Sequence, residues 1–523
     1  MPTYTTPGVY VTESALAPLT QPTTSGTAAV FFGEANRGPT TATLIQDWPT
    51  YKNTYGDLTN SSDLGYAVYH YFANGGRNCY VVRVVASAAA VATSASVPYY
   101  PTGSGAASAS LFSLTTTSKG AWGNSVTVSV AKGNIPGTAS TYGTFALVVF
   151  NNGVEVERWT ELTRDPNGSR YAPAVINTYS KYVNVTSTAG VSSISTAATS
   201  ASEDWFTGAR TFTGGSDGTI APDTDYPLFK DTIDIIDGPL ILNVVGKAST
   251  TIVTAFGTKA KDRGDSILIV DPVLGDADYA TLETTVANLN SVTPQNYIAL
   301  YTPMLKMIDP AKSGPGAVRT TYPGGAVCGL IVRTETERTV AKAPAGYAAD
   351  IRGALGLSVT LTDDQIGRLY SGVDANGVPA QRPQANSFKV VPGGGITVYG
   401  ARTMTKVTPD KHISVRRTLN HVKYNLKALT RFAVFEPNDL NLWNTLNLTI
   451  SGFLNELWRS GALKGNRSSD AFYVVCDSTN NSSVSMDNGQ VNIQVGVALL
   501  TPAEFIVIDV SQWTGGSNTV ETL

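Results

Sequence analysis

The chain has 523 residues. A domain with a single hydrophobic core is normally smaller than this, so two to four domains are expected. Charged residues make up only 15% of it, against about 25% in ordinary globular domains, and Thr, Ser, Ala, Gly and Val take their place. The formal net charge of −3 does not indicate a nucleic-acid-binding protein, and no apolar run reaches the roughly 18 residues that a membrane helix needs.

The first segment predicts an arm followed by a small α/β unit. Residues 1–25 are rich in Pro and Thr and contain one strand-like stretch, Gly8 to Glu13. Such a segment buries little of itself, so we expect an extended arm, and its start lacks the basic and apolar regions of a signal peptide. Residues 26–85 follow with the order strand, helix, strand and a helix stop at Gly75-Gly76, which permits parallel pairing.

Composition then changes abruptly. No residue between Arg83 and Lys119 is charged, and a second charge-free tract occupies 182–202. Short β-like runs lie between these tracts, and Asn151-Asn152-Gly153 is a hairpin signal. We expect 86–204 to be an inserted, mostly β outer domain, because an insertion costs little where its ends lie close together.

From Trp205 the α/β pattern resumes. Continuous apolar runs at 240–245 and 266–271 are typical of buried parallel strands, with a helix around 252–263 between them and a further strand at 297–301. We therefore expect 26–85 and 205–380 to form one α/β core that is discontinuous in sequence.

The segment from 412 to 510 predicts a compact α+β module. Leu419, Val422, Leu426 and Leu429 recur at 3-4-3 spacing on one face of a first helix. A second helix carries a wider apolar stripe over 442–458 and meets glycines, at 461 and 465, where a helix would stop. Strands are expected at 472–477, at 491–497 with alternating apolar residues, and at 503–510.

Candidate catalytic groups are few. Asp271 ends a buried strand, where α/β enzymes often place an acid, but a turn begun with Pro272 is the preferred interpretation, since no His or Lys adjoins it. The Gly-rich stretches 214–218 and 392–396 lack the Lys-Ser/Thr of a phosphate loop. A hydrolase is therefore an alternative without a supporting constellation.

Metal ligands are equally scarce. The histidines His412 and His421 lie nine residues apart, in positions that do not chelate one metal ion, and His70 stands alone. The three cysteines (Cys79, Cys328 and Cys476) show no C-x-x-C spacing and are expected to be structural thiols. The sequence predicts no catalytic site, no metal and no cofactor.

An ordered set of short motifs carries a family resemblance. They are PGVYV at 7–11 with Glu13, then 333–338, KAPA at 342–345, YGART at 399–403, FEPND at 435–439, 453–459, 461–465, FYVVCD at 472–477 and PAEF at 502–505. In this order they resemble contractile tail sheath proteins of phages, R-type pyocins and related injection machines. The resemblance covers about the first eighty residues and most of 205–510 but not 86–204, and the linker 382–392 departs from the family pattern.

The resemblance implies a structural subunit rather than an enzyme. Such subunits polymerise as stacked hexameric rings around a tail tube and contract to drive the tube through the host envelope for genome ejection. The implied partners are further copies of the chain, the tail tube protein, and baseplate and tail terminator proteins, without nucleic acid or membrane insertion. The implied location is the virion, after assembly in the cytoplasm of the bacterial host.

The resemblance also implies a role for both chain ends. Each end would add a strand to the C-terminal sheet of a neighbour, which is β-augmentation through heterologous contacts. The fold expected is thus α+β and multidomain: an N-terminal arm at 1–25, the discontinuous core, the insertion, a C-terminal domain at 381–510 facing the tube, and a C-terminal strand and arm at 503–523. The strand residues of the two arms are Val9, Tyr10, Val11, Phe505, Ile506, Val507, Ile508 and Val510.

A basic stripe on the first C-terminal helix is the candidate tube contact. At 100° per residue, Arg416, Lys423, Lys427 and Arg431 project within roughly 80° of one another, away from the apolar stripe. A solvated basic face is an equally weighted interpretation. In the sheath family, a docking surface for an acidic tube is the functional one.

Two alternative functions remain open. One is the sheath of a phage-derived, pyocin-like injection particle. The other, from a different class, is a glycan-binding surface protein in which aromatic residues of 86–204 stack on sugars, although core packing is the more common fate of such residues. Those aromatic residues are Tyr99, Tyr100, Trp122, Trp159 and Tyr171.

Overall fold

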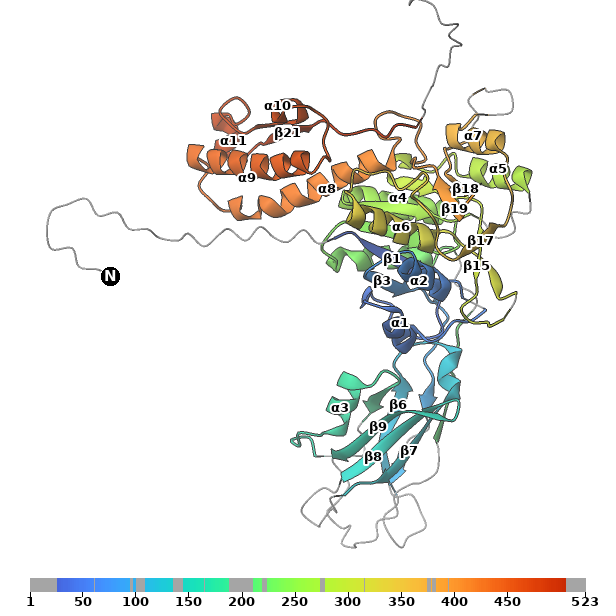
Figure 1. The fold of residues 1–523 in the computed structure, drawn as a ribbon. Helices are drawn as coiled ribbons and strands as arrows, with labels where there is room; N and C mark the ends of the chain where they lie inside the picture. Colours follow the sequence, from blue (N-terminus) through green and yellow to red (C-terminus); the bar gives the residue numbers. More distant parts are fainter. Residues whose placement is uncertain are drawn as a thin grey trace, which may run out of the picture.

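The computed structural model describes residues 26–60, 62–94, 97–99, 109–134, 144–163, 165–187, 210–218, 223–272, 278–314, 316–373, 378, 382–393 and 395–504. Figure 1 shows three bodies: a central α/β body, a β-rich body below it built from the segment after β3, and a helical module at the upper left built from the last part of the chain. The prediction of a mixed chain with several separate sheets is confirmed.

The central body is organised around a six-stranded sheet in the order β14-β13-β12-β1-β3-β2. Its strands are β1 (Ala28–Gly33), β2 (Thr43–Ile45), β3 (Cys79–Arg83), β12 (Leu240–Val244), β13 (Ser266–Val270) and β14 (Ile298–Leu300). All neighbouring strands are parallel except β2, which pairs antiparallel with β3. Segments on both sides of the β-rich body in sequence thus share one sheet, and the predicted parallel strands at 240–245 and 266–271 are confirmed.

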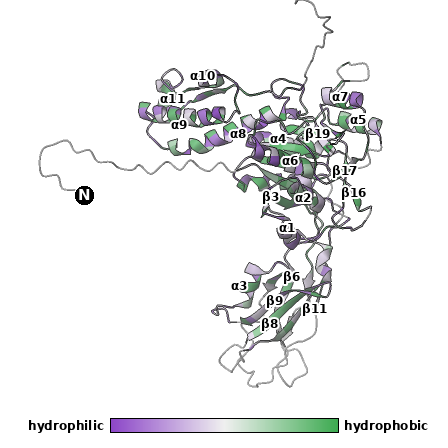
Figure 2. Cartoon of the chain, in the orientation of Figure 1, coloured by the Kyte–Doolittle hydropathy of each residue, from purple (hydrophilic) through white to green (hydrophobic). Residues whose placement is uncertain are grey.

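Alternate residues of this sheet feed two separate cores. On β1, Ala29 and Phe31 join the core under α2 and α6, whereas Val30 and Phe32 join the core under α4 and α5. Figure 2 shows the resulting band of apolar strands between amphipathic helices. The helices of this body are α1 (Trp48–Tyr55), α2 (Leu64–Ala73), α4 (Thr250–Arg263), α5 (Tyr279–Asn288), α6 (Gly324–Glu337) and α7 (Asp363–Ser371), with the 3-10 helices η2 (Tyr226–Ile235) and η3 (Gln295–Tyr297).

Two small sheets flank the central body. The first has the order β16-β15-β17 and the second is the hairpin β18-β19. Their bounds are β15 (Leu305–Ile308), β16 (Val318–Thr321), β17 (Ala354–Leu357), β18 (Ser387–Val391) and β19 (Gly395–Tyr399). The chain between β19 and α8 then returns along the edge of the main sheet, where the Met404 N–H donates to the Ile298 carbonyl at 2.8 Å.

The β-rich body is one antiparallel sheet in the order β10-β6-β4-β11-β7-β8-β9, with β5 paired to β6. Its elements are β4 (Thr93–Ser94), β5 (Val97–Tyr99), β6 (Ala109–Thr116), η1 (Ala121–Ser125), β7 (Val126–Lys132), β8 (Thr144–Asn151), β9 (Val154–Thr163), α3 (Ala172–Tyr179), β10 (Val183–Ser187) and β11 (Arg210–Thr213). The predicted hairpin lies between β8 and β9, where Asn152 (φ 51°) and Gly153 (φ 77°) form the tight turn. Strand β11 lies beyond residue 204, the expected end of the insertion.

The C-terminal module consists of two long helices over a two-stranded sheet. Its elements are α8 (Ile413–Leu429), η4 (Arg431–Ala433), α9 (Leu440–Arg459), α10 (Ser468–Ala471), β20 (Phe472–Val475), α11 (Ser483–Asp487) and β21 (Gln494–Val497). Both predicted helices are confirmed, and α9 packs its stripe of Ile450, Leu454 and Leu457 on the sheet. The strand expected over 491–497 is shorter, because the Asn492 N–H donates to the Asn481 side chain at 2.6 Å instead of to a strand.

Asp271, considered in the sequence as an acid or a turn residue, joins the end of β12 and the start of α6 at the carboxyl end of the main sheet. Its carboxylate accepts hydrogen bonds from the backbone of Gly324 (2.6 Å), the first residue of α6, from the backbone of Gly246 (3.1 Å) and from the Asn243 amide (3.1 Å). A Cβ at Gly324 would lie 2.6 Å from this carboxylate, so only glycine permits the approach. Burial outweighs these three donors and raises the pKa of Asp271 to about 6.

We predict that Asp271→Ala destabilises the central body, because three buried donors lose their acceptor. The free energy of unfolding should fall by about 3 kcal/mol, measured as the shift of the main calorimetric transition. The matched control is Asp364→Ala, whose side chain is 68% exposed and pairs with Arg368 on the same helix. A shift no larger than that of the control would contradict the assignment.

Candidate functional site

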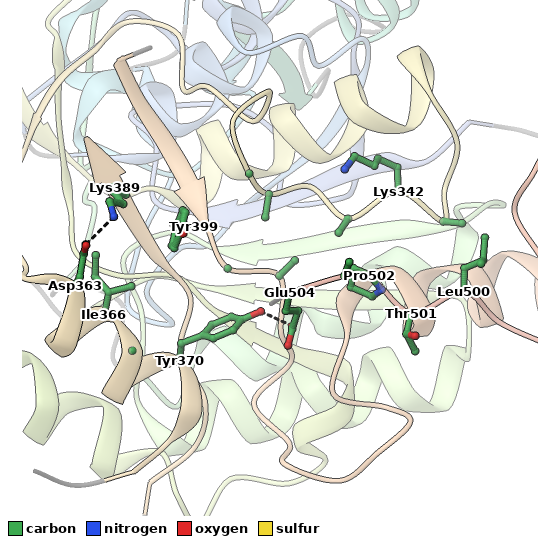
Figure 3. A pocket seen from close by; sticks show the side chains of 18 residues that line it. Lys342, Asp363, Ile366, Tyr370, Lys389, Tyr399, Leu500, Thr501, Pro502 and Glu504 are labelled. Atoms are coloured by element: carbon green, nitrogen blue, oxygen red, sulfur yellow. Dashed lines mark hydrogen bonds and ion pairs between the residues drawn. The ribbon is translucent and has the colours of Figure 1, made fainter. Parts of the chain in front are cut away.

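The described chain ends at a carboxylate that is clamped from three sides. After β21, residues 498–504 (the stem) run back to the central body and finish at Glu504. The Arg402 guanidinium forms an ion pair with this carboxylate and donates from Nε at 3.0 Å, and the Tyr370 hydroxyl donates to it as well. His412 Nδ1 lies 3.2 Å from Glu504 Oε1. Figure 3 shows the Tyr370 hydroxyl directed at Glu504.

The clamp consists of Tyr370, Arg402, His412 and Glu504, and the central body fixes the first two. Tyr370 lies on α7, which begins with a capping box between Thr362 and Gln365. The Arg402 backbone exchanges two hydrogen bonds with the Asn386 side chain, both at 2.7 Å, and its guanidinium stacks 3.9 Å from the Tyr370 ring centroid. The site is therefore preorganised by the central body.

The clamp is charged at neutral pH. Burial by itself raises the pKa of Glu504, but the Arg402 guanidinium and the Tyr370 hydroxyl outweigh it, so that the pKa lies below its usual value. Burial is also the main reason that the pKa of His412 is lowered, which leaves this imidazole neutral at pH 7. The pKa of Glu504 is lower in the folded state than in the unfolded state. The clamp therefore stabilises the fold fully at pH values above the unfolded-state pKa, and this stabilisation is lost as the pH falls through the folded-state pKa.

A cavity of about 700 Å³ lies beside the clamp, between the stem and the segment 341–346. Its apolar wall includes Ala341, Ala345 and Ile366, and the rings of Tyr370 and Tyr399 line it. Lys389 pairs with Asp363 at 2.7 Å on one side of it, whereas the exposed Lys342 on the other side has no ion pair with any described residue. Figure 3 shows these side chains around the opening.

The sheet of the C-terminal module is incomplete. Strands β20 and β21 pair with each other over four residues, and each has a side on which no described strand pairs. Two-stranded sheets are marginal by themselves, and an unpaired strand edge presents free N–H and C=O groups. Just beyond β21, the Lys464 N–H donates to the Ala498 carbonyl at 2.8 Å and Leu463 forms a bridge with Leu499, so the chain itself occupies part of that edge.

The predicted basic stripe is divided by the structure. Lys423, Lys427 and Arg431 are exposed and line one cavity of about 650 Å³ with acidic residues of η2 and α4, and Arg431 lies 3.5 Å from Asp237. Arg416 is buried, pairs with Asp410 and stacks 4.5 Å from the Tyr297 ring. The prediction that all four share one surface is wrong for Arg416, because the first half of α8 is covered by the central body. The tube contact of the other three stays a prediction.

The predicted arm strands fall outside the described residues. This holds for Val9, Tyr10 and Val11 at one end and for Phe505, Ile506, Val507, Ile508 and Val510 at the other. Among the glycan candidates, Trp122 and Trp159 pack against the core of the β-rich sheet, and Tyr100 lies outside the described part. Core packing is thus the role of the two tryptophans.

Metal and membrane signatures are not found in the described part of the chain. No cluster of three or more His, Cys, Asp or Glu side chains there could hold a metal ion, and none of its helices combines the length and apolarity that crossing a bilayer requires. Cys79, Cys328 and Cys476 are buried free thiols.

Sequence reasoning did not find the clamp, although two quoted motifs contain it. Arg402 lies in the motif at 399–403 and Glu504 in the motif at 502–505, about one hundred residues apart. Nothing in their local spacing indicates that they meet. The one available signal was that each of the two is a charged residue in a motif made otherwise of uncharged residues.

We predict that Glu504→Ala releases the stem. Removing one partner of a largely buried ion pair should cost about 2 kcal/mol, so the stem should be detached about thirtyfold more often. Limited proteolysis with mass spectrometry should show faster cleavage within 499–504. Glu456→Ala, an exposed site on α9, is the control, and equal cleavage rates in both variants would show that the clamp does not hold the stem.

Comparison with known proteins identifies relatives. Residues 408–512 match the family model of the phage tail sheath C-terminal domain. The tail sheath protein of Enterobacteria phage T4 is 29% identical over 169 residues, 31% of this chain and 23% of the relative. The tail sheath protein of Vibrio phage KVP40 is 24% identical over 340 residues, 60% of this chain and 48% of the relative, so the matches span less than half the length of either relative.

Solved structures share the fold over nearly the whole chain. The contracted helical sheath of the anti-feeding prophage has a TM-score of 0.56 at 19% identity and covers 98% of this chain and 100% of its own. The crystal structure of a sheath tail protein from Listeria innocua has a TM-score of 0.59 at 14% identity, with 92% and 96% covered. The resemblance of this chain to contractile tail sheath proteins is therefore confirmed, and it is carried by the match of residues 408–512 to the phage tail sheath C-terminal domain.

Proposed function

We propose that this chain is the structural subunit of a contractile tail sheath. It polymerises as stacked hexameric rings around a tail tube, between a baseplate and a terminator, and its contraction drives the tube through a host envelope. The match of residues 408–512 to the sheath C-terminal domain carries the proposal. The fold shared with sheath proteins over 98% of the chain supports it.

The proposed assembly rests on the incomplete sheet of β20 and β21. A strand from the N-terminal arm of one neighbour and a strand from the C-terminal arm of another would extend this sheet. The Val- and Ile-rich stretches at 8–13 and 505–510 have suitable sequences. The clamp at Glu504 supports the same assignment, because it fixes the point from which the C-terminal arm departs.

The chain has no proposed catalytic role. The buried carboxylate of Asp271 is occupied by three structural donors, and the charged groups around Glu504 are paired with one another.

A phage-derived injection particle is the second candidate. It is favoured by the likeness to sheaths of the anti-feeding prophage and of the PVC extracellular contractile injection system, each spanning 98% of this chain at 19% identity. Adjacent genes for a capsid and a terminase would assign the chain to a virion with genome ejection, and their absence would assign it to an injection particle.

We predict that deleting residues 2–13 leaves a folded chain that does not polymerise, because each neighbour's sheet then lacks one strand. Circular dichroism should match the full chain, while negative-stain electron microscopy should show no tubes. The full chain under the same conditions is the control. Long tubes from the truncated chain would refute strand addition by this arm.

We predict that Lys423→Glu with Lys427→Glu abolishes decoration of tail tubes and leaves self-assembly of the sheath intact. Both side chains are exposed on α8, so the reversal should change surface charge without unfolding the helix. Co-sedimentation with purified tubes measures the binding. The paired reversal Lys261→Glu and Lys306→Glu, at two exposed positions of the central body, is the charge-matched control. Normal decoration by the α8 variant would show that the stripe does not face the tube.

A further inference from the structure

The turn between α8 and α9 presents an aromatic side chain to solvent. Phe435 is fully exposed, and its neighbours Phe432 (45%), Val434 (64%) and Leu440 (62%) are also largely exposed. A cluster of large apolar groups at one turn is uncommon on a surface that stays solvated. The backbone of Phe435 has φ +70°, a conformation that non-glycine residues rarely adopt and that tends to be retained at functional positions.

Hydrogen bonds of the residues that follow Phe435 fix the turn in place. The Asn438 side chain accepts from the Trp443 indole at 2.9 Å and donates to the Gln490 carbonyl at 3.0 Å, while Asp439 caps α9 by accepting from the Leu442 N–H at 2.9 Å. Phe435 therefore extends from a fixed base, and little conformational freedom is lost when it is bound.

A concave surface with the complementary character lies elsewhere on the same chain. The cavity beside Glu504 has a volume of about 700 Å³, which is large enough for an aromatic side chain and its apolar neighbours. Its wall carries Ala341, Ile366 and the Tyr399 ring, and Tyr347, which follows the lining residue Gly346, is 72% exposed.

The turn and the cavity also carry opposite charges. Glu436 follows Phe435, is exposed and has no ion pair with any described residue, and Lys342 at the cavity is likewise exposed and unpaired within the described part. Bringing the two together would place opposite charges at the edge of an apolar contact, an arrangement that selects orientation.

The two surfaces cannot meet within one chain. Figure 1 shows α8 running outward from the central body, so the turn after it lies at the far end of the C-terminal module, whereas the cavity lies where α7, β19 and the stem meet. Unlike surfaces at opposite ends of one molecule make a heterologous contact, which propagates from copy to copy.

We propose that the Phe435 turn of one copy docks into the cavity beside Glu504 of a second copy, with Glu436 against Lys342. The contact rests on the proposed sheath function and adds to it a side-chain interface that is independent of the terminal arms. Phe435 supplies the apolar anchor, and the charge pair sets the register.

Substitution tests the anchor. Phe435→Ala should raise the critical concentration for polymerisation about tenfold, since a buried aromatic anchor is lost. Leu448→Ala, on a residue of α9 that is 77% exposed, is the matched control and should have no effect. Glu436→Lys and Lys342→Glu should each weaken polymerisation, and their combination in one chain should restore it. If the single variants failed because they were misfolded, combining them would not restore polymerisation, so restoration would identify loss of the charge pair as the cause.

Crosslinking tests the contact directly. The native cysteines are buried, so Glu436→Cys and Lys342→Cys chains can be purified separately, mixed and treated with a short bismaleimide. We expect a crosslinked dimer from this mixture and none from Leu448→Cys with Lys342→Cys. Tubes without the crosslink would overturn the docking and leave the sheath function standing. Crosslinked dimers from a chain that forms no tubes would support the docking and contradict the sheath function. If neither tubes nor crosslinked dimers form, both proposals are overturned.

Discussion

The buried polar seam along the first half of α8 determines how the C-terminal module stands on the central body. Arg417 pairs with Glu335 of α6, both largely buried, and Asn420 donates to the Ser266 carbonyl at the start of β13 at 2.9 Å. Burial tends to raise the pKa of Glu335, but Arg417 outweighs it and lowers the pKa. The pair is therefore charged at neutral pH, and loss of one partner would leave a buried charge at a cost of about 3–5 kcal/mol. The second half of α8 carries the module, and its exposed basic residues line a cavity together with η2 and α4 of the central body.

The elements that the sequence predicts are those with a recognisable apolar pattern, either a short continuous apolar run or a periodic stripe. The apolar runs at 240–245 and 266–271 become parallel strands because both of their faces are covered, and α9 follows its stripe from Leu442 to Leu457. Helix α6 escapes prediction because it is longer than a buried strand and has no exposed face over most of its length. Its residues from Gly324 to Arg333 are all buried, so no polar face reveals a helical repeat.

Long-range contacts account for the other differences. The helical wheel places Arg416 with Lys423 and Lys427, but it does not show that the central body covers one turn and not the next. Asp271 reads locally as a turn residue, and only the folded sheet brings it to the first residue of α6. The clamp of Arg402 on Glu504 joins residues about one hundred apart in sequence, and neither local pattern nor charge spacing encodes that meeting.

The ends of the C-terminal module meet at one point. The chain enters the module at His412 and leaves it at Glu504, and these two side chains lie 3.2 Å apart beside Arg402. The Glu504 side chain is thus tied directly to Arg402 and Tyr370 of the central body, in addition to its covalent connection through β21. Under the proposed strand exchange, tension between copies would run from the body of the donor to the small sheet of the acceptor.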